Sequence, residues 1–150
     1  MSEFCYASPL GTILLTAQDG ALIGAAFVDE PAEATLPTDP VLLQAIAWLD
    51  RYFAGDDPGP IPPVQTHGTA FQSKVWSALG LIPYGETVSY ANLAARCGCP
   101  KAHARAVGAA VGKNPLAIFL PCHRVLANHG MGGYAFGLDC KRKLLELETL

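Results

Sequence analysis

The first 63 residues are almost without positive charge, and no hydrophobic run in the chain is long enough to cross a membrane. Residues 1–63 contain nine Asp and Glu residues but a single Lys or Arg, which is Arg51, and they contain no histidine. No apolar stretch approaches the roughly 18 residues that a membrane-spanning helix needs. The N-terminal residues also lack the basic segment and apolar core of a secretory signal. We therefore expect a cytoplasmic protein with no membrane partner.

Charged side chains are scarce overall, at 15% of 150 residues, whereas 51% of the residues are hydrophobic. This composition excludes a disordered or collagen-like chain, and the length allows a substantial core without disulfides. The cysteines number five, an odd count, and structural disulfides are rare in a reducing compartment. Each thiol is therefore a core residue, a metal ligand or a nucleophile.

The positive charge is concentrated in residues 64–150, which hold nine Lys and Arg, four carboxylates and all four histidines. A basic segment beside an acidic one indicates an anionic partner for the basic segment, although such a partition also arises by chance. The Pro- and Gly-rich stretch over 55–63 is typical of a linker. We expect an N-terminal lobe over 1–63 and a C-terminal domain over 64–150.

The N-terminal lobe is predicted to combine strands with one helix. Apolar runs over 11–17 and 21–28 are typical of strands, and Asp19-Gly20 between them is a hairpin-type turn signal. Asp39-Pro40 predicts a helix start, with Asp as the cap and Pro at the first helical position. The apolar residues that follow keep helical spacing as far as Phe53.

The C-terminal domain is predicted to be mostly helical, which makes the whole chain an α+β protein. Thr69-Ala-Phe-Gln72 is a capping box. A short helix from Tyr90 to about Arg96 and another over about 101–111, joined by a Gly-containing turn, fit a winged-helix-like helix-turn-helix. The second helix consists almost entirely of small residues around Arg105. Small side chains allow close approach to another helix or to DNA, and Arg105 could equally pair with the acidic lobe.

Pro121-Cys122-His123-Arg124-Val125 is the segment richest in reactive side chains. Neighbouring His and Arg favour the thiolate, which is the nucleophilic form of cysteine. The apolar run over 116–120 predicts a buried extended segment leading into it. Adjacent residues of a strand point to opposite faces, so a Cys–His contact would need an irregular backbone or a bridging water. A buried structural cysteine is the alternative.

This five-residue run resembles the active-site signature of the O6-alkylguanine-DNA alkyltransferases, also called methylated-DNA–protein-cysteine methyltransferases. The similarity extends over 68–148, whereas the first 63 residues match only in general style. Further motifs follow in the family's order: Phe71-Gln-x-x-Val-Trp76, Pro83-Tyr-Gly-Glu-Thr-Val-Ser-Tyr90, Arg105-Ala-Val-Gly108, Asn114-Pro115 and Leu144-Leu-x-x-Glu148.

The resemblance implies roles for individual residues in catalysis. Cys122 would accept the alkyl group, and His123 would act as its base through a water molecule. Glu148 would orient His123, with Glu146 as a rival for this role, and the arrangement would match a nucleophile–base–orienter triad. Tyr90 would press on the DNA backbone and offer its hydroxyl to guanine N3.

The resemblance also implies a DNA surface and a substrate pocket. Arg105 would fill the gap left by a flipped base, while its helix, including Ala104 and Ala106, lies in the minor groove. Arg124 is expected to contact DNA. The pocket is expected to contain Tyr134, Ala135, Val125 and Asn114, with Asn114 bracing the active-site turn. Ala135 departs from the family, which often has Ser there, so a hydroxyl contact to guanine O6 is lost.

The implied activity is direct repair of DNA in a single, irreversible turnover that consumes the protein. The expected partner is double-stranded DNA containing O6-alkylguanine, with O4-alkylthymine left open, and the protein is expected to be a monomer. No cofactor is required. A zinc site is not expected in the N-terminal lobe, which offers only Cys5, and Cys97, Cys99 and His103 lack a clear fourth ligand.

Three other functions compete with this interpretation. A non-catalytic alkyltransferase-like lesion binder would share the fold but lack the reactive Cys122. A sequence-specific regulator would need polar base-reading side chains on its second helix, which here is mostly alanine. A cysteine hydrolase would need an oxyanion-binding turn, and no Gly-rich turn precedes the cysteine.

Overall fold

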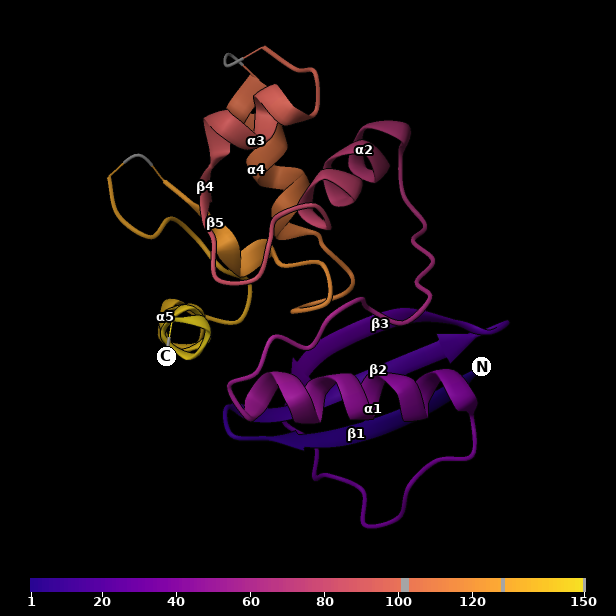
Figure 1. Ribbon diagram of the computed structural model, residues 1–150. Coiled ribbons are helices and arrows are strands. Elements are labelled where there is room, and N and C mark those ends of the chain that lie inside the picture. The colour runs from indigo at the N-terminus through magenta and orange to yellow at the C-terminus, as the bar shows by residue number, and fades with distance from the viewer. Residues whose placement is uncertain (101–102, 128, 150) are drawn as a thin grey trace. The chain divides into compact units, whose positions relative to one another are not determined.

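The computed structural model describes residues 1–100, 103–127 and 129–149, and these form two compact units. The first unit comprises Met1–Thr66 together with Pro115–Ala117, and the second comprises His67–Asn114 together with Ile118–Thr149. Figure 1 shows the strands of the first unit and most of the helices of the second. The mixture confirms the predicted α+β class. Among the described residues, no helix is long and apolar enough to cross a membrane.

The first unit contains a three-stranded antiparallel sheet of β1 (Ser2–Ser8), β2 (Gly11–Gln18) and β3 (Ala21–Val28), in that order. The β2–β3 turn follows the predicted signal, because Asp19 and Gly20 both have positive φ, as a tight hairpin requires. Helix α1 (Pro40–Phe53) lies across the sheet (Figure 1) and begins at the predicted cap. The core of this unit lies between the helix and the sheet, where its fully or nearly buried side chains include Ile13, Leu15, Leu22, Leu42, Leu49 and Tyr52.

The outer edge of β3 holds two segments from later in the sequence. The backbone N–H of Leu22 donates to Pro63 (2.8 Å), and the N–H of Ala25 donates to Pro115 (2.9 Å). Ala117 returns a bond to the carbonyl of Ala25 at 3.0 Å. The chain is therefore fixed on this edge shortly before it reaches the cysteine at 122.

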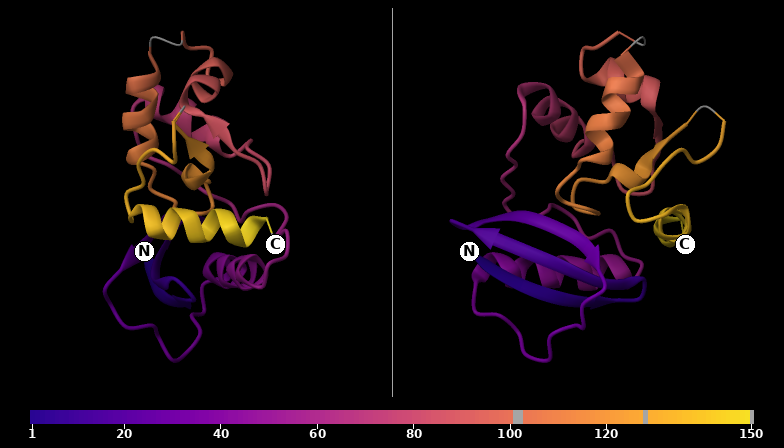
Figure 2. Two further views of the ribbon diagram at one scale, coloured as in Figure 1. Left: turned by 90° about the vertical axis from the view of Figure 1, so that its left-hand side faces the viewer. Right: turned by 180° about the vertical axis from the view of Figure 1, so that it is seen from behind.

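The second unit is built on three helices that pack against one another, α2 (Ala70–Leu79), α3 (Tyr90–Arg96) and α4 (Ala104–Gly112), and on α5 (Leu138–Glu148), which packs against the turn over Cys122–Arg124. The predicted capping box is present at the start of α2. The indole N–H of Trp76 donates to the carbonyl of Ala110 (2.9 Å), which ties α2 to α4. Strands β4 (Val88–Ser89) and β5 (Val125–Leu126) form a short parallel pair. Figure 2 shows this unit from two further sides.

The predicted helix pair is confirmed as α3 and α4. Helix α3 has the predicted bounds, and Ser89 caps it by accepting from the N–H of Asn92 (3.0 Å). The described part of α4 begins at Ala104. The start predicted at Lys101 lies outside the described residues.

The prediction of an extended run over 116–120 is wrong. These residues are buried as expected, but the backbone turns, and only Leu116 forms a β-bridge among them. Ile118 has a φ of 72°, which is unusual for a β-branched residue. Because the bonds to β3 end at Ala117, the turn redirects the chain from that edge toward Cys122.

Candidate active site

Cys122 opens a single turn of 3₁₀ helix, η2 (Cys122–Arg124), rather than lying on a strand. The backbone N–H of Cys122 donates to Leu120 at 2.7 Å, and that of Arg124 donates to Pro121 at 3.0 Å. Successive side chains of a 3₁₀ turn are about 120° apart, since the turn has about three residues. The irregular backbone that a Cys–His arrangement would need is therefore present.

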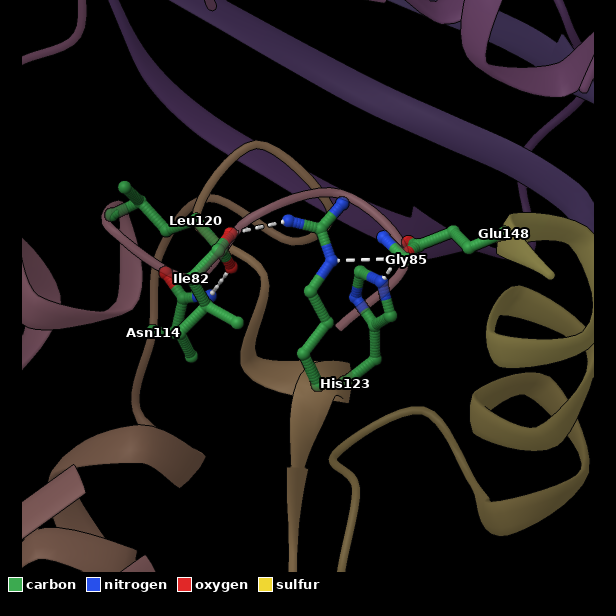
Figure 3. Close-up of polar contacts among 7 residues, drawn as sticks. Ile82, Gly85, Asn114, Leu120, His123 and Glu148 are labelled. Atoms are coloured by element: carbon green, nitrogen blue, oxygen red, sulfur yellow. Dashed lines mark hydrogen bonds and ion pairs between the residues drawn. The ribbon is translucent and has the colours of Figure 1, made fainter. Parts of the chain in front are cut away.

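Asn114 braces this turn from the end of α4. Its side-chain amide donates to the carbonyl of Leu120 at 2.6 Å (Figure 3). It also hydrogen-bonds the thiol of Cys122, which lowers the pKa of that thiol. Asn114 therefore acts on both the backbone and the sulfur of the turn, in addition to lining the pocket beside it.

His123 turns toward the end of α5, where it contacts Glu148 (Figure 3). Arg124 contacts the same carboxylate. Nε2 of His123 lies 2.5 Å from Oε2 of Glu148, and Nε of Arg124 donates to Oε1 at 2.7 Å. The backbone N–H of Gly85 also donates to Oε1, at 3.2 Å. The rival carboxylate, Glu146, is 67% exposed and faces Arg142 instead. Glu148 is therefore the carboxylate that contacts His123.

The expectation that Arg124 contacts DNA is wrong for this arrangement. Its side chain is buried, and Nη1 donates to the carbonyl of Ile82 at 2.8 Å while Nε binds Glu148. Its guanidinium carbon lies 5.7 Å from the centre of the Tyr84 ring. A guanidinium used in this way inside the unit is not available to a phosphate.

The resting thiol is not activated in the way its sequence neighbours suggest. Burial raises the pKa of Cys122, against smaller lowering effects from Asn114, nearby backbone N–H groups and the charge of Lys141. Burial also lowers the pKa of His123, although Glu148 opposes this shift. Both effects favour a neutral thiol beside a neutral imidazole. The thiolate must therefore form during the reaction.

Cys122 lines a cavity of about 150 Å³ whose walls are mostly apolar. The walls are formed by α4, the start of α3 and the loop before α5, through Tyr90, Gly108, Val111, Gly112, Asn114, Gly133, Tyr134, Ala135 and Phe136. Of the predicted pocket residues, Val125 is the exception. It is fully buried and pairs with Val88 in the short parallel sheet, so it lies behind the cavity.

Tyr90 forms one wall, and Gly132 allows it to lie there. A Cβ on Gly132 would come within 3.0 Å of its ring, whereas a Cβ on Gly108 would be at an ordinary contact distance of 3.7 Å. The backbone N–H of Gly133 donates to the Tyr90 hydroxyl oxygen, while burial raises the pKa of the phenol. The hydroxyl hydrogen is therefore left to donate elsewhere.

Tyr134 forms another part of the wall. Its ring meets Phe136 edge to face, with centres 5.6 Å apart. The Tyr134 hydroxyl is buried and has no hydrogen-bond partner among the residues that the structure describes. Burial raises the pKa of this phenol, so it stays protonated. A ligand with a polar edge could satisfy it.

Lys141 is a residue that the sequence analysis missed. It is fully buried on α5, and its ammonium group donates to three carbonyls, those of Val125 (2.7 Å), Met131 (2.5 Å) and Gly133 (3.0 Å). It thereby ties β5 to the loop that forms the pocket wall. The spacing of Lys141 with Leu144 and Glu148 on one helical face is the signal that could have found it.

The residues predicted to meet DNA lie at the start of α4. Arg105 and Ala106 are exposed, and Ala104 is partly exposed. Arg105 precedes the pocket residue Gly108 by one helical turn. Within its unit, Arg105 forms no ion pair with any described residue. The alanines therefore leave an open helix surface beside the pocket.

No group of three or more His, Cys, Asp or Glu residues is arranged to hold a metal ion in the described part of the chain. This includes the turn that contains Cys97, Cys99 and His103. The thiol of Cys99 points to the carbonyl of Cys97 (3.9 Å), as in an ordinary turn. All five cysteines are free thiols.

Two protein-family models match the chain. Residues 1–58 match the ribonuclease-like domain of 6-O-methylguanine DNA methyltransferase, and residues 70–150 match its DNA-binding domain. The chain is similar to the methylated-DNA–protein-cysteine methyltransferase of Mycobacterium leprae, with 43% identity over 94% of this chain and 88% of the relative. It is also similar to the protein of that name in Methanosarcina acetivorans, with 42% identity over 95% of each chain.

The chain is also similar to solved structures over most of its length. The crystal structure of Mycobacterium tuberculosis O6-methylguanine methyltransferase has a TM-score of 0.86 at 39% identity, covering 98% of this chain and 92% of that one. The crystal structure of Mycobacterium tuberculosis OGT in complex with DNA has a TM-score of 0.85 at 40% identity, with coverage of 97% and 91%. The likeness therefore extends over both units.

Proposed function

The chain belongs to the 6-O-methylguanine DNA methyltransferase family, and from this premise we propose how its own residues carry out the reaction. Its function is direct DNA repair, by transfer of an alkyl group from O6-alkylguanine in DNA to a cysteine of the protein. The observation that carries our assignment of residues is the position of Cys122. It is the one cysteine among the residues that line the apolar cavity, and it precedes a histidine held by a buried carboxylate.

The transfer begins with loss of the Cys122 proton to His123 through a water molecule, while Glu148 stabilises the imidazolium that forms. The sulfur then attacks the alkyl carbon, so that an S–C bond forms as the C–O6 bond breaks. The electron pair of that bond moves into the guanine ring, where the Tyr90 hydroxyl donates to N3. Guanine takes its proton from the Tyr90 hydroxyl, and the proton on His123 passes through solvent to restore that hydroxyl, so that His123 and Tyr90 both end neutral. The thioether has no good leaving group, so the protein acts once.

DNA is bound by the second unit in this proposal. Helix α4 enters the minor groove, where the small side chains of Ala104 and Ala106 permit close approach. The target base must leave the stack to reach Cys122, and Arg105 fills the space that it leaves. Residues 64–150 then form the DNA-binding and alkyl-acceptor domain, and residues 1–63 form a structural lobe.

Several finer statements belong to the same proposal. The protein acts as a monomer on double-stranded DNA that contains O6-alkylguanine, and activity on O4-alkylthymine is left open. The reaction needs Cys122 as a free thiol, which a reducing compartment such as the cytoplasm maintains. No cofactor takes part in the proposed reaction, because side chains supply the nucleophile, the base and the proton donor, and water carries the protons between them.

Intact-protein mass spectrometry after mixing with O6-methylguanine duplex tests the assignment of Cys122. One methyl group should be added to the wild type and none to Cys122→Ala. Cys140→Ala is the matched control, since Cys140 is a partly exposed thiol on α5, and it should still gain one methyl group. A protein that binds the lesion but never gains mass would be a non-catalytic lesion binder. Undiminished transfer in Cys122→Ala would show that the assignment is wrong.

A further inference from the structure

Glu148 shares its carboxylate between an imidazole and a guanidinium. Oε2 lies 2.5 Å from Nε2 of His123, and Oε1 accepts from Nε of Arg124 at 2.7 Å. The side chains of Glu148, His123 and Arg124 are 1%, 0% and 7% exposed, respectively. All three are therefore shielded from water, and an uncompensated charge in such a buried position is costly.

Arg124 is also fixed by the segment between α2 and β4. Its Nη1 donates to the carbonyl of Ile82 at 2.8 Å, and its guanidinium lies against the ring of Tyr84. Gly85 of the same segment donates to Oε1 of Glu148. The guanidinium thus has a defined position on the side of the carboxylate away from the imidazole.

The charges in this cluster balance while the histidine is neutral. With Arg124 positive, Glu148 negative and both Cys122 and His123 uncharged, the cluster has no net charge. Without the guanidinium, the buried carboxylate would lack its partner cation, and a buried carboxylate in that position binds a proton. Because Glu148 and His123 are in contact, that proton belongs to the pair as a whole. A pair that already holds it cannot accept another from the thiol.

We propose that Arg124 is a positioning residue for alkyl transfer, which keeps His123 in its neutral, proton-accepting form by balancing the charge of Glu148. The inference rests on the proposed roles of Cys122, His123 and Glu148. The charged groups that act on His123 are Arg124 from its own turn and Glu148 and Lys141 from α5, and Cys122 is its titratable neighbour in the turn. Lys141 has its own carbonyl partners, so the guanidinium is the cation in direct contact with the carboxylate.

The test is the pH dependence of the single-turnover rate of methyl transfer from an O6-methylguanine duplex. In Arg124→Met, the acid limb of the profile should move to higher pH by about one unit or more, and at pH values on that limb transfer should be about tenfold slower for each unit of the shift. The rate should approach that of the wild type as the pH rises. Arg124→Lys retains the charge and should keep the acid limb near its wild-type position.

Three results would overturn the proposal. A rate that falls equally at every pH in Arg124→Met would mean that the residue supports only the fold. An unshifted profile with weaker, less salt-dependent DNA binding would mean that it contacts phosphate. An acid limb that moves as far in Arg124→Lys as in Arg124→Met would mean that the charge is not responsible.

A second variant keeps the test valid if Arg124→Met does not fold. The double variant Arg124→Met/Glu148→Gln removes both charges, and replacing a buried pair is tolerated better than leaving one member alone. Its acid limb should not move upward, because no buried carboxylate is left to bind the proton. An upward shift there would contradict the proposal. The proposed function itself is tested separately with Cys122→Ala. Methylation of that variant would show that the assignment of Cys122 is wrong, whatever the Arg124 variants do.

Discussion

The ring of Tyr90 lies so close to Gly132 that a Cβ on the glycine would come within 3.0 Å of a ring carbon and 3.2 Å of the hydroxyl oxygen. Gly132 also has a φ of 72°, a conformation that favours glycine. The next residue, Gly133, donates its N–H to the same hydroxyl. The loop before α5 therefore determines where the Tyr90 phenol lies in the wall of the cavity.

Replacement of Gly132 should consequently damage repair through Tyr90. Gly132→Ala should slow methyl transfer from duplex DNA by about tenfold or more, since a displacement of about 1 Å can have an effect of that size. It should also cost about 1–3 kcal/mol of unfolding free energy from backbone strain. Gly130→Ala is the control, because Gly130 has a φ of 110° and a Cβ there would meet no atom within 4 Å. Equal loss of activity in both variants would argue against displacement of Tyr90.

Lys141 should be essential for the stability of the pocket wall. Lys141→Met keeps much of the side-chain volume but leaves three carbonyls without their donor, which should lower the free energy of unfolding by about 2 kcal/mol or more. Denaturant unfolding measures this effect. Lys143→Met is the control, because Lys143 pairs with Asp139 on the exposed face of α5 (3.3 Å) and should change the stability by less than about 1 kcal/mol. Similar losses in both variants would show that the buried contacts of Lys141 contribute little.

In the absence of DNA, Cys122 should rest as a protonated thiol and react only through its minor thiolate fraction. Burial raises its pKa above the ordinary value of 9.0, so the thiolate fraction should still be increasing at that pH. The rate of its modification by iodoacetamide, followed by peptide mapping, should therefore rise with pH and show no plateau below about pH 9. Asn114→Ala removes a hydrogen bond that lowers this pKa, and it should move the curve to higher pH. A plateau near neutral pH would show that the resting cysteine is already a thiolate.

Much of the fold could be predicted because its signals are local. The turn at Asp19-Gly20, the cap at Asp39, the capping box before α2 and the bounds of α3 all depend on residues within a few positions of one another. Tertiary contacts decided the rest. The run over 116–120 is apolar enough for a strand, but hydrogen bonds to β3 stop at Ala117 and the backbone then turns.

The same distinction applies to the site. The short motif around Cys122 could be found in the sequence, but the direction of each side chain could not. Arg124 is an ordinary surface residue by type, and its contacts with Glu148, 24 positions later, and with the carbonyl of Ile82, 42 positions earlier, place it inside. Lys141 begins a run of three cations and was indistinguishable by composition from its exposed neighbours. Long-range pairing of this kind leaves little trace in one sequence.

Arg105 should be needed for base flipping but not for chemistry at the thiol. It is exposed at the start of α4, and its proposed part is to hold the extruded state, which costs a few kcal/mol of unstacking. Arg105→Ala should therefore slow repair in duplex DNA by about tenfold or more, since each 1.4 kcal/mol is about a factor of ten. Free O6-benzylguanine needs no flipping, so this variant should react with it at nearly the wild-type rate, provided that the wild type itself accepts the benzyl group. Glu148→Gln should impair both reactions alike, because it disturbs His123, and Arg96→Ala, at an exposed position on α3, should impair neither. Equal losses on duplex and free base in Arg105→Ala would show that Arg105 supports the fold or the thiolate, and the flipping role would be wrong.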